Sequence, residues 1–123
     1  MLKVHAKNLG NVAVLCLQGR IVKGETEILR KALHSLSEVS AVILDLARVT
    51  TVDARGLGVM LELREQAESK GIRFELMNVN NLVRRILEVT RLDSVFAVTS
   101  GVEFFPAVSR GRQASMPWLA SCA

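Results

Sequence analysis

The run of residues 41–46 constrains the fold more than any other feature of this chain. It reads Ala-Val-Ile-Leu-Asp-Leu, and only Asp45 interrupts its apolar character. A continuous apolar run of this length is typical of a strand in a parallel sheet, buried on both of its faces. We therefore expect this strand to end at Asp45 or Leu46, with layers of structure packed above and below the sheet.

A helix is predicted directly after this strand. Residues 49–59 read Val-Thr-Thr-Val-Asp-Ala-Arg-Gly-Leu-Gly-Val, and Asp53 stands where a side chain can accept a hydrogen bond from a free N–H group of a new helix. Gly56 and Gly58 are expected to keep the first turn of that helix open to a partner. We place the candidate functional site at this corner between strand and helix.

The rest of the chain alternates between strand-like and helix-like segments. Strands are expected at residues 2–7, 12–17, 41–46, 73–78 and 95–98. Helices are expected from a first turn that contains Glu25 and Glu27, over 54–70, after a cap at Asn80 or Asn81, and weakly over 102–108. The helical stripes predicted to face the core include Ile28 in the first helix and Leu82 and Val89 in the third.

This order predicts the α/β class. Strands joined through helices imply right-handed crossovers and a mostly parallel sheet, here of about five strands with an N-terminal edge strand and about four flanking helices. At 123 residues the chain forms one domain, expected over residues 1–109. A tail rich in Arg, Gly, Gln and Ser follows over 110–123, and Trp118 and Leu119 are its candidates for docking on this chain or on a neighbour.

Composition argues against several functions. No segment approaches the roughly 20 apolar residues that span a bilayer, and the N-terminus lacks the pattern of a secretory signal, so a cytoplasmic protein without membrane insertion is expected. The net charge of +4 comes from cations interleaved with Glu, without aromatic residues among them, which argues against nucleic acid as a partner. Cys16, Cys122 and the two histidines lack metal-site spacing, and both cysteines are expected to be thiols.

No catalytic constellation is recognisable. The sequence contains neither a P-loop, nor the Gly-x-Gly-x-x-Gly pattern of dinucleotide-binding folds, nor a Gly-x-Ser-x-Gly elbow. Asp45 and Asp53 are the nearest approach to a carboxylate pair, but one is expected at the end of a strand and the other at a helix cap. We expect a protein that is not an enzyme and binds no cofactor or metal.

Several segments together resemble a STAS domain, the fold of bacterial anti-sigma factor antagonists. Residues 42–46 are similar to the third strand of that family, 52–59 to its Asp-Ser-Ser-Gly-Leu-Gly corner, and 80–92 to its third helix and the following turn. Residues 17–21 resemble the end of its second strand, although Val22 stands where an acidic residue often follows. The resemblance covers nearly everything before the tail.

The resemblance implies how the corner works. The simplest members of the family bind an anti-sigma factor that is also a serine kinase, and phosphorylation of a serine at the helix start breaks that complex. In this sequence Arg55 aligns with that serine and Ala54 with the serine before it, so the usual phosphorylation is impossible. Arg55 is then either a solvated residue of a drifted domain or a contact to an acidic partner. Thr50 and especially Thr51 are candidates for a substitute phosphoacceptor.

The expected function is regulatory protein binding, with an anti-sigma factor or a related signalling kinase as the partner. The residues predicted to bind it come from the corner and from the end of the second strand: Thr50, Thr51, Asp53, Ala54, Arg55, Gly56, Leu57, Gly19, Arg20 and Lys23. The resemblance also allows a subunit of a larger assembly, such as a stressosome-like complex or a lipid-transport ABC transporter. A homodimer is left open.

Overall fold

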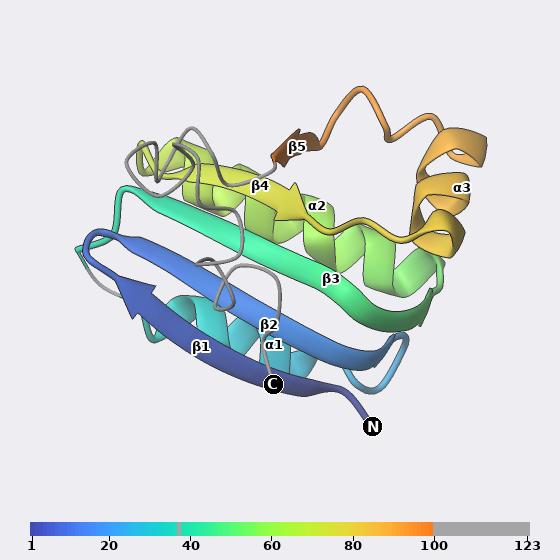
Figure 1. The fold of residues 1–123 in the computed structure, drawn as a ribbon, viewed down its shortest axis with the longest axis horizontal. Coiled ribbons are helices and arrows are strands. Elements are labelled where there is room, and N and C mark those ends of the chain that lie inside the picture. The colour runs from blue at the N-terminus through green and yellow to red at the C-terminus, as the bar shows by residue number, and fades with distance from the viewer. Residues whose placement is uncertain (37, 100–123) are drawn as a thin grey trace, which may run out of the picture.

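A computed structural model describes residues 1–36 and 38–99 of the chain. These residues form five strands and three helices, in the alternating order expected of the α/β class (Figure 1). The strands are β1 (Lys3–Leu9), β2 (Val12–Ile21), β3 (Ala41–Val52), β4 (Arg73–Met77) and β5 (Ala97–Thr99). The helices are α1 (Glu27–His34), α2 (Ala54–Ser69) and α3 (Asn81–Val89).

The strands form one sheet in the order β1-β2-β3-β4-β5. The edge strand β1 is antiparallel to β2, whereas every other neighbouring pair is parallel. The predicted sheet of five strands, mostly parallel and with an N-terminal edge strand, is therefore confirmed. The fourth expected helix, at 102–108, and the expected tail at 110–123 lie outside the described residues.

Strand β3 is longer than predicted. It continues past Asp45 to Val52, so the expectation that the strand ends near Asp45 is wrong. The extension pairs with the second half of β2, whose last residue Ile21 lies beside Val52 after two irregularities in the register. In the second half of β3 only Val49 and Val52 are buried, so this part has neither a continuous apolar run nor the strict alternation that predicts a strand from sequence.

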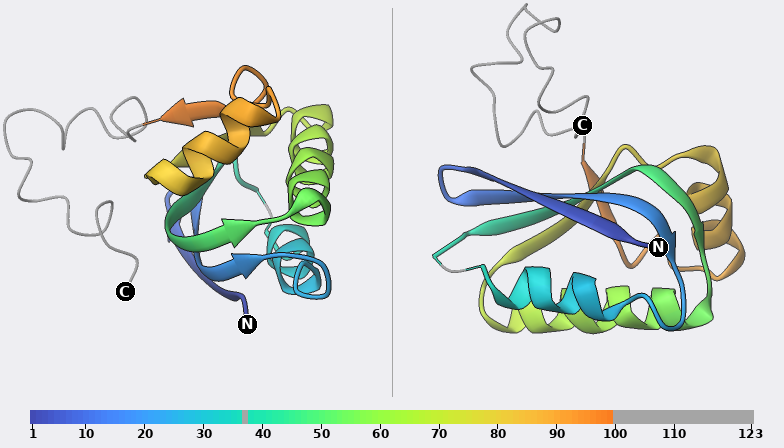
Figure 2. Two further views of the ribbon diagram at one scale, coloured as in Figure 1. Left: turned by 90° about the vertical axis from the view of Figure 1, so that its right-hand side faces the viewer. Right: turned by 90° about the horizontal axis from the view of Figure 1, so that it is seen from below.

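Helices α1 and α2 lie side by side on the same face of the sheet (Figure 2). Helix α1 connects β2 to β3, and α2 connects β3 to β4, so both crossovers run in the same direction along the sheet. Because both crossovers are right-handed, their helices lie on the same face. The main core lies between these helices and the sheet, and its fully buried members include Leu15, Leu29, Leu44, Met60, Leu63 and Leu76. In the described part of the chain no helix covers the other face, so the expected layers on both faces are not met there.

Helix α3 lies at the end of the sheet, against the C-terminal half of β3. Asn80 caps it by accepting a hydrogen bond from the Val83 N–H at 2.9 Å, which confirms one of the two predicted caps. The Asn80 amide also donates to the Val49 carbonyl at 2.8 Å and so fixes the helix to β3.

Three side chains assigned to the core are exposed instead. Leu82 and Val89 on α3 are 49% and 78% exposed, and Ile28 on α1 is 44% exposed. Helical spacing places a residue on an apolar arc but does not set how wide a contact the neighbouring elements make, so the edge of each arc remains in solvent.

Candidate functional site

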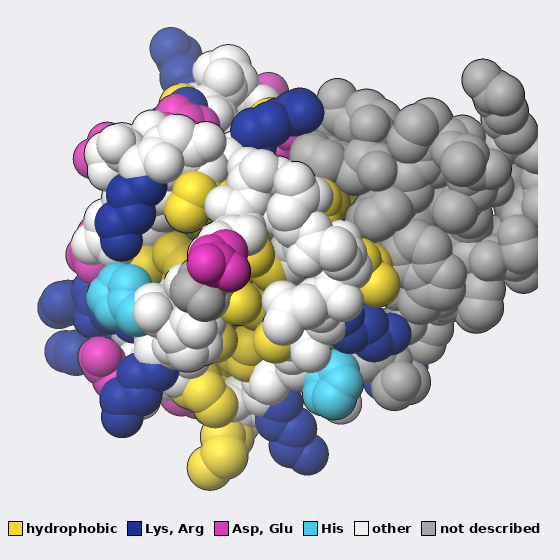
Figure 3. All heavy atoms as spheres, turned by 90° about the vertical axis from the view of Figure 1, so that its left-hand side faces the viewer, with side chains coloured by type: hydrophobic (Ala, Val, Ile, Leu, Met, Phe, Trp, Pro, Cys, Tyr) yellow, Lys and Arg dark blue, Asp and Glu magenta, His cyan; other side chains and the backbone are white. Residues whose placement is uncertain are grey.

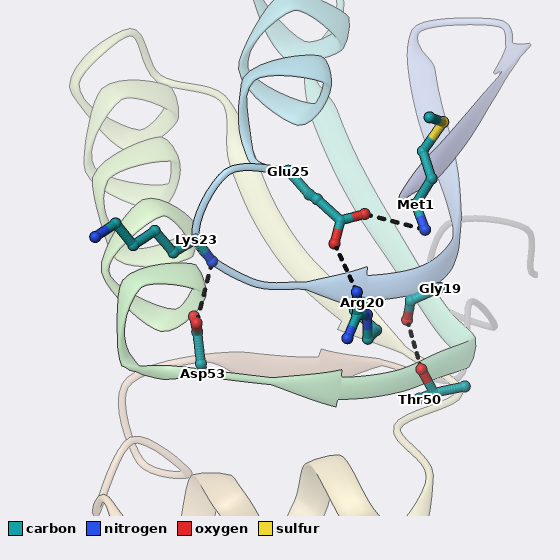
Figure 4. Close-up of polar contacts among 7 residues, drawn as sticks. All are labelled: Met1, Gly19, Arg20, Lys23, Glu25, Thr50 and Asp53. Atoms are coloured by element: carbon teal, nitrogen blue, oxygen red, sulfur yellow. Dashed lines mark hydrogen bonds and ion pairs between the residues drawn. The ribbon is translucent and has the colours of Figure 1, made fainter.

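The predicted corner is organised around the carboxylate of Asp53. One oxygen accepts a hydrogen bond from the Gly56 N–H at 2.8 Å, which is the predicted N-cap of α2. The other oxygen accepts from the backbone N–H of Lys23 at 3.0 Å (Figure 4). One side chain therefore starts α2 and also holds the loop between β2 and α1.

Further contacts fasten the same two segments. The Asp53 N–H donates to the Ile21 carbonyl at 3.3 Å, and the Thr50 hydroxyl donates to the Gly19 carbonyl at 3.2 Å. Gly19 has a φ of +112°, and a Cβ there would lie 2.5 Å from the Met1 carbonyl oxygen, so this position requires glycine. The predicted grouping of Gly19–Lys23 with Thr50–Leu57 is thus present in the structure.

Glu25 belongs to this site, although sequence analysis assigned it to a helix. Helix α1 begins only at Glu27, and Glu25 precedes it in the loop. Its carboxylate lies 3.4 Å from the Arg20 guanidinium and 3.1 Å from the amino group of Met1 (Figure 4). These contacts hold the pKa of Glu25 below its usual value, with the hydrogen bond to the amino group as the largest cause. The single negative charge of Glu25 is therefore shared between Arg20 and the amino terminus.

Arg55 lies on the exposed side of the first turn of α2, where it lines a shallow groove beside α1. The groove is lined by Arg30, Ala54, Arg55, Gly58, Val59 and Glu62. Arg30 makes two hydrogen bonds of 3.1 Å to the Glu62 carboxylate, and these raise the pKa of Arg30. This bidentate pair joins α1 to α2 next to Arg55, and sequence analysis missed it because its partners lie in different helices.

Two cations at the corner have no anionic partner among the described residues. Lys23 and Arg55 are both exposed, and neither takes part in an ion pair there. The Lys23 side chain points away from Asp53, whose oxygens are engaged by backbone N–H groups (Figure 4). The surface around the start of α2 thus carries uncompensated positive charge.

Three predicted site residues are less accessible than expected. Gly56 is buried, and a Cβ at this position would lie 1.8 Å from the Ile21 carbonyl oxygen. The prediction that Gly56 keeps the turn open is therefore wrong, because this glycine allows β2 to approach the helix. Leu57 is buried in the core, Thr51 is half-buried, and Gly58 alone of the two glycines faces open space.

Asp45 and Asp53 lie in different environments. Burial raises the pKa of Asp45, whose oxygens accept hydrogen bonds from the Ala47 N–H and the Asn78 amide. The pKa of Asp53 is lowered, first by the hydrogen bond from the Lys23 N–H and then by that from Gly56. Each carboxylate has its own set of donors, and the arrangement is that of two structural anchors rather than an acid and a base.

A separate hollow of about 210 Å³ lies at the opposite end of the sheet, between the C-terminal ends of α1 and α2. Figure 3 shows apolar side chains gathered at this end, with charged side chains around them. The lining is mainly aliphatic and includes Leu33, Leu36, Val39 and Ile72. None of the predicted site residues lines this hollow.

In residues 1–36 and 38–99, no three His, Cys, Asp or Glu side chains are grouped so that they could hold a metal ion. None of the helices described there is both long and apolar enough to cross a bilayer.

Comparison with known proteins agrees with this architecture. A STAS-domain containing protein of Pseudomonas aeruginosa is 26% identical over 91 residues, which are 73% of this chain and 90% of the relative. An anti-sigma factor antagonist from Mycobacterium paratuberculosis superposes with a TM-score of 0.73 at 20% identity, over 89% of this chain and 95% of that one.

Two further solved structures are similar in fold. The anti-sigma factor antagonist SpoIIAA in its unphosphorylated form gives a TM-score of 0.68 at 20% identity, over 86% of this chain and 96% of that one. A sulfate transporter family protein from Wolinella succinogenes gives 0.66 at 23% identity, over 75% and 80%. The family model of the STAS domain itself matches residues 3–110, and the chain belongs to the STAS domain family.

Proposed function

We propose that this protein is a non-enzymatic regulatory module of the anti-sigma factor antagonist type, acting in the cytoplasm. It binds an anti-sigma factor or a related signalling kinase through the surface formed by the start of α2 and the loop between β2 and α1. Arg55 and Lys23 make the charged contacts of this surface, and the partner presents acidic side chains to them.

The Asp53 carboxylate is the observation that carries the proposal. By bonding to both Lys23 and Gly56, it holds two segments from different parts of the chain in one fixed surface. Preorganisation of this kind lowers the entropic cost of binding. Because Asp53 and Glu25 are already engaged, the charge left for a partner is positive. Complementary charge at an interface favours association and selects the partner.

Arg55 also determines how the module is regulated. It is the second residue of α2, and the resemblance aligns it with the phosphoacceptor serine of the family. A guanidinium cannot be phosphorylated, so the protein is not switched at that position and remains in the binding state. Thr51 is the candidate for a substitute acceptor, although it must become more accessible to reach a kinase because it is half-buried.

Affinity purification of the tagged protein from its native host, followed by mass spectrometry, tests the proposal. We expect an anti-sigma factor or a serine kinase of that class to co-purify with the wild-type protein and with Arg84→Glu, a charge reversal on α3. It should be lost with Arg55→Glu. Recovery that does not differ between the two variants would exclude the corner as the binding site.

A second candidate is a STAS subunit of a larger assembly. It is favoured by the similarity to the sulfate transporter family protein, whose fold matches over three quarters of this chain. The same purification separates the two functions, because recovery of transporter or stressosome-like components would identify a subunit of an assembly.

A further inference from the structure

A groove of about 430 Å³ lies between α1 and α2, on the side of the corner where Arg55 lies. The two helices lie side by side (Figure 2), and each contributes side chains to the groove. Gly58 lines it between Arg55 and Glu62, and no atom lies within 4 Å of the position that a Cβ would take there. The proposed function uses only Arg55 among the lining residues, so most of this open groove has no assigned role.

The end of the groove at the start of α2 is positively charged. Arg55 is exposed and takes part in no ion pair within residues 1–36 and 38–99. The first turn of α2 contains no acidic side chain, and the N-terminus of a helix itself carries partial positive charge. The Asp53 carboxylate, which precedes this turn, is engaged by the N–H groups of Lys23 and Gly56. An incoming acidic side chain is therefore favoured at this end.

The other end of the groove carries net negative charge. The Arg30 guanidinium makes two hydrogen bonds of 3.1 Å to Glu62 and lies 3.5 Å from the carboxylate of Glu27. One positive charge is thus shared by two carboxylates, and both glutamates are exposed. An incoming basic side chain is therefore favoured here. The ion pair between α1 and α2 also holds the two sides of the groove at a fixed distance.

The length of the groove fits a helix. Arg55 and Glu62 are seven positions apart on α2, about 10 Å along its axis, which corresponds to two helical turns. Residues at i, i+4 and i+7 of a docked helix lie on one face, so a short helix can reach both charged ends and the space over Gly58. A strand that crosses the same distance would present only every second side chain, about two in all.

We propose that this groove receives a two-turn amphipathic helix of the protein that binds at the corner. An acidic side chain near one end of that helix pairs with Arg55, and a basic side chain near the other end pairs with Glu27 and Glu62. An aliphatic side chain between them packs over Gly58. The opposite charges also fix the direction of the helix, because a reversed helix would bring like charges together. This inference rests on the proposed function, which places the partner at Arg55, and extends its surface along α2.

Substitutions that fill the groove without changing its charges test the inference. Gly58→Gln places a long neutral side chain in open space and introduces a good helix former, so the variant should fold. Ala54→Gln fills the lining one turn earlier and serves as a second variant. The matched control is Glu65→Gln, which puts the same side chain at an exposed position of α2 that does not line the groove.

The measurement is affinity purification from the native host, with the recovered anti-sigma factor or serine kinase quantified by mass spectrometry. We expect Gly58→Gln and Ala54→Gln each to lower its recovery by more than about ten-fold, because the added side chain overpacks the interface. Glu65→Gln should keep the recovery within about two-fold of the wild-type value, as a surface substitution outside the groove. Urea denaturation should show that Gly58→Gln is at least as stable as the wild-type protein.

Hydrogen exchange of the isolated complex identifies the bound segment of the partner. We expect protection of a helix that carries an acidic and a basic side chain two turns apart. Protection of a segment without this helix or without these charges would overturn the proposed occupant.

The purification separates failure of this inference from failure of the proposed function. If Gly58→Gln and Ala54→Gln recover the partner as well as the wild-type protein does, while Arg55→Glu loses it, the groove is not a binding site and the corner remains one. If Arg55→Glu also recovers it, or if the wild-type protein recovers no protein of this class, the proposed function is wrong and the inference fails with it.

Discussion

The backbone N–H of Lys23 lies 3.0 Å from the carboxylate of Asp53, thirty positions away in the sequence. This hydrogen bond joins the loop before α1 to the first turn of α2. The same carboxylate caps α2 through Gly56, so one side chain supports both segments of the proposed binding surface. Asp53 is therefore a positioning residue, whereas Lys23 and Arg55 provide the charges that face outward.

Substitutions of Asp53 test how much its hydrogen bonds from Lys23 and Gly56 contribute to stability. We expect Asp53→Ala to lower the free energy of unfolding by about 1 to 2 kcal/mol, because the loss of an N-cap alone costs about 1 kcal/mol. Asp53→Asn keeps a cap but loses one acceptor, so it should cost less. Urea denaturation measures both. Equal stability of the wild-type protein and Asp53→Ala would show that the two hydrogen bonds contribute nothing.

The lowered pKa of Asp53 predicts a dependence of stability on pH. A carboxyl group whose pKa is lower in the folded state stabilises the fold above its unfolded pKa of about 3.9, and this contribution is lost as pH falls through the folded value. The wild-type protein should therefore lose more stability than Asp53→Asn between about pH 5 and the lowered pKa. Urea denaturation at a series of pH values checks this, and parallel losses in the two proteins would contradict it.

The two glycines at the start of α2 should respond oppositely to alanine. Gly56→Ala would bring a Cβ to 1.8 Å from the Ile21 carbonyl oxygen, so β2 or α2 must shift. We expect a loss of about 1 to 3 kcal/mol in the free energy of unfolding. Gly58 has nothing within 4 Å of an added Cβ. Gly58→Ala should raise stability by up to about 1 kcal/mol, because alanine favours the helix. Equal effects of the two substitutions would contradict the close approach of β2.

The substitution Arg55→Ser should make the start of α2 a site of phosphorylation. In Arg55→Ser the new side chain lies in the first turn of α2, where exposed N–H groups and the helix dipole stabilise a phosphate. After incubation with a serine-kinase anti-sigma factor and ATP, the mass of this variant should increase by one phosphate. The wild-type mass should stay unchanged, and Arg55→Ala serves as the control. A phosphate on the wild-type protein that Thr51→Val removes would identify Thr51 as a substitute acceptor.

Much of the fold was predictable because its signals are local. The apolar run at 41–46, the Asp53 cap and the Asn80 cap each depend on neighbouring residues, and the structure confirms all three. The end of β3 was not predictable, because its second half is strand only through pairing with β2. The exposure of Leu82 and Val89 depends likewise on what packs beside α3 rather than on α3 itself.

The candidate site was likewise predictable only in part. Sequence placed Asp53 and Arg55 at the corner and grouped Gly19–Lys23 with them. It could not show that Gly56 is packed against Ile21. A glycine that lets a neighbouring strand approach the helix cannot be distinguished, in the sequence alone, from a glycine that leaves the helix surface open. Glu25 and the pair of Arg30 with Glu62 were also missed, since each contact joins segments that meet only in the folded chain.

The most direct test of the account is the affinity of the isolated partner for two charge-reversal variants, measured by calorimetry. Arg55 lies at the corner, and Arg84 is an exposed cation on α3 that likewise lacks an ion pair among the described residues. We predict that Arg55→Glu weakens binding by more than about 1 kcal/mol and that Arg84→Glu leaves it unchanged. Equal affinities for the two variants would contradict binding through the corner at the start of α2.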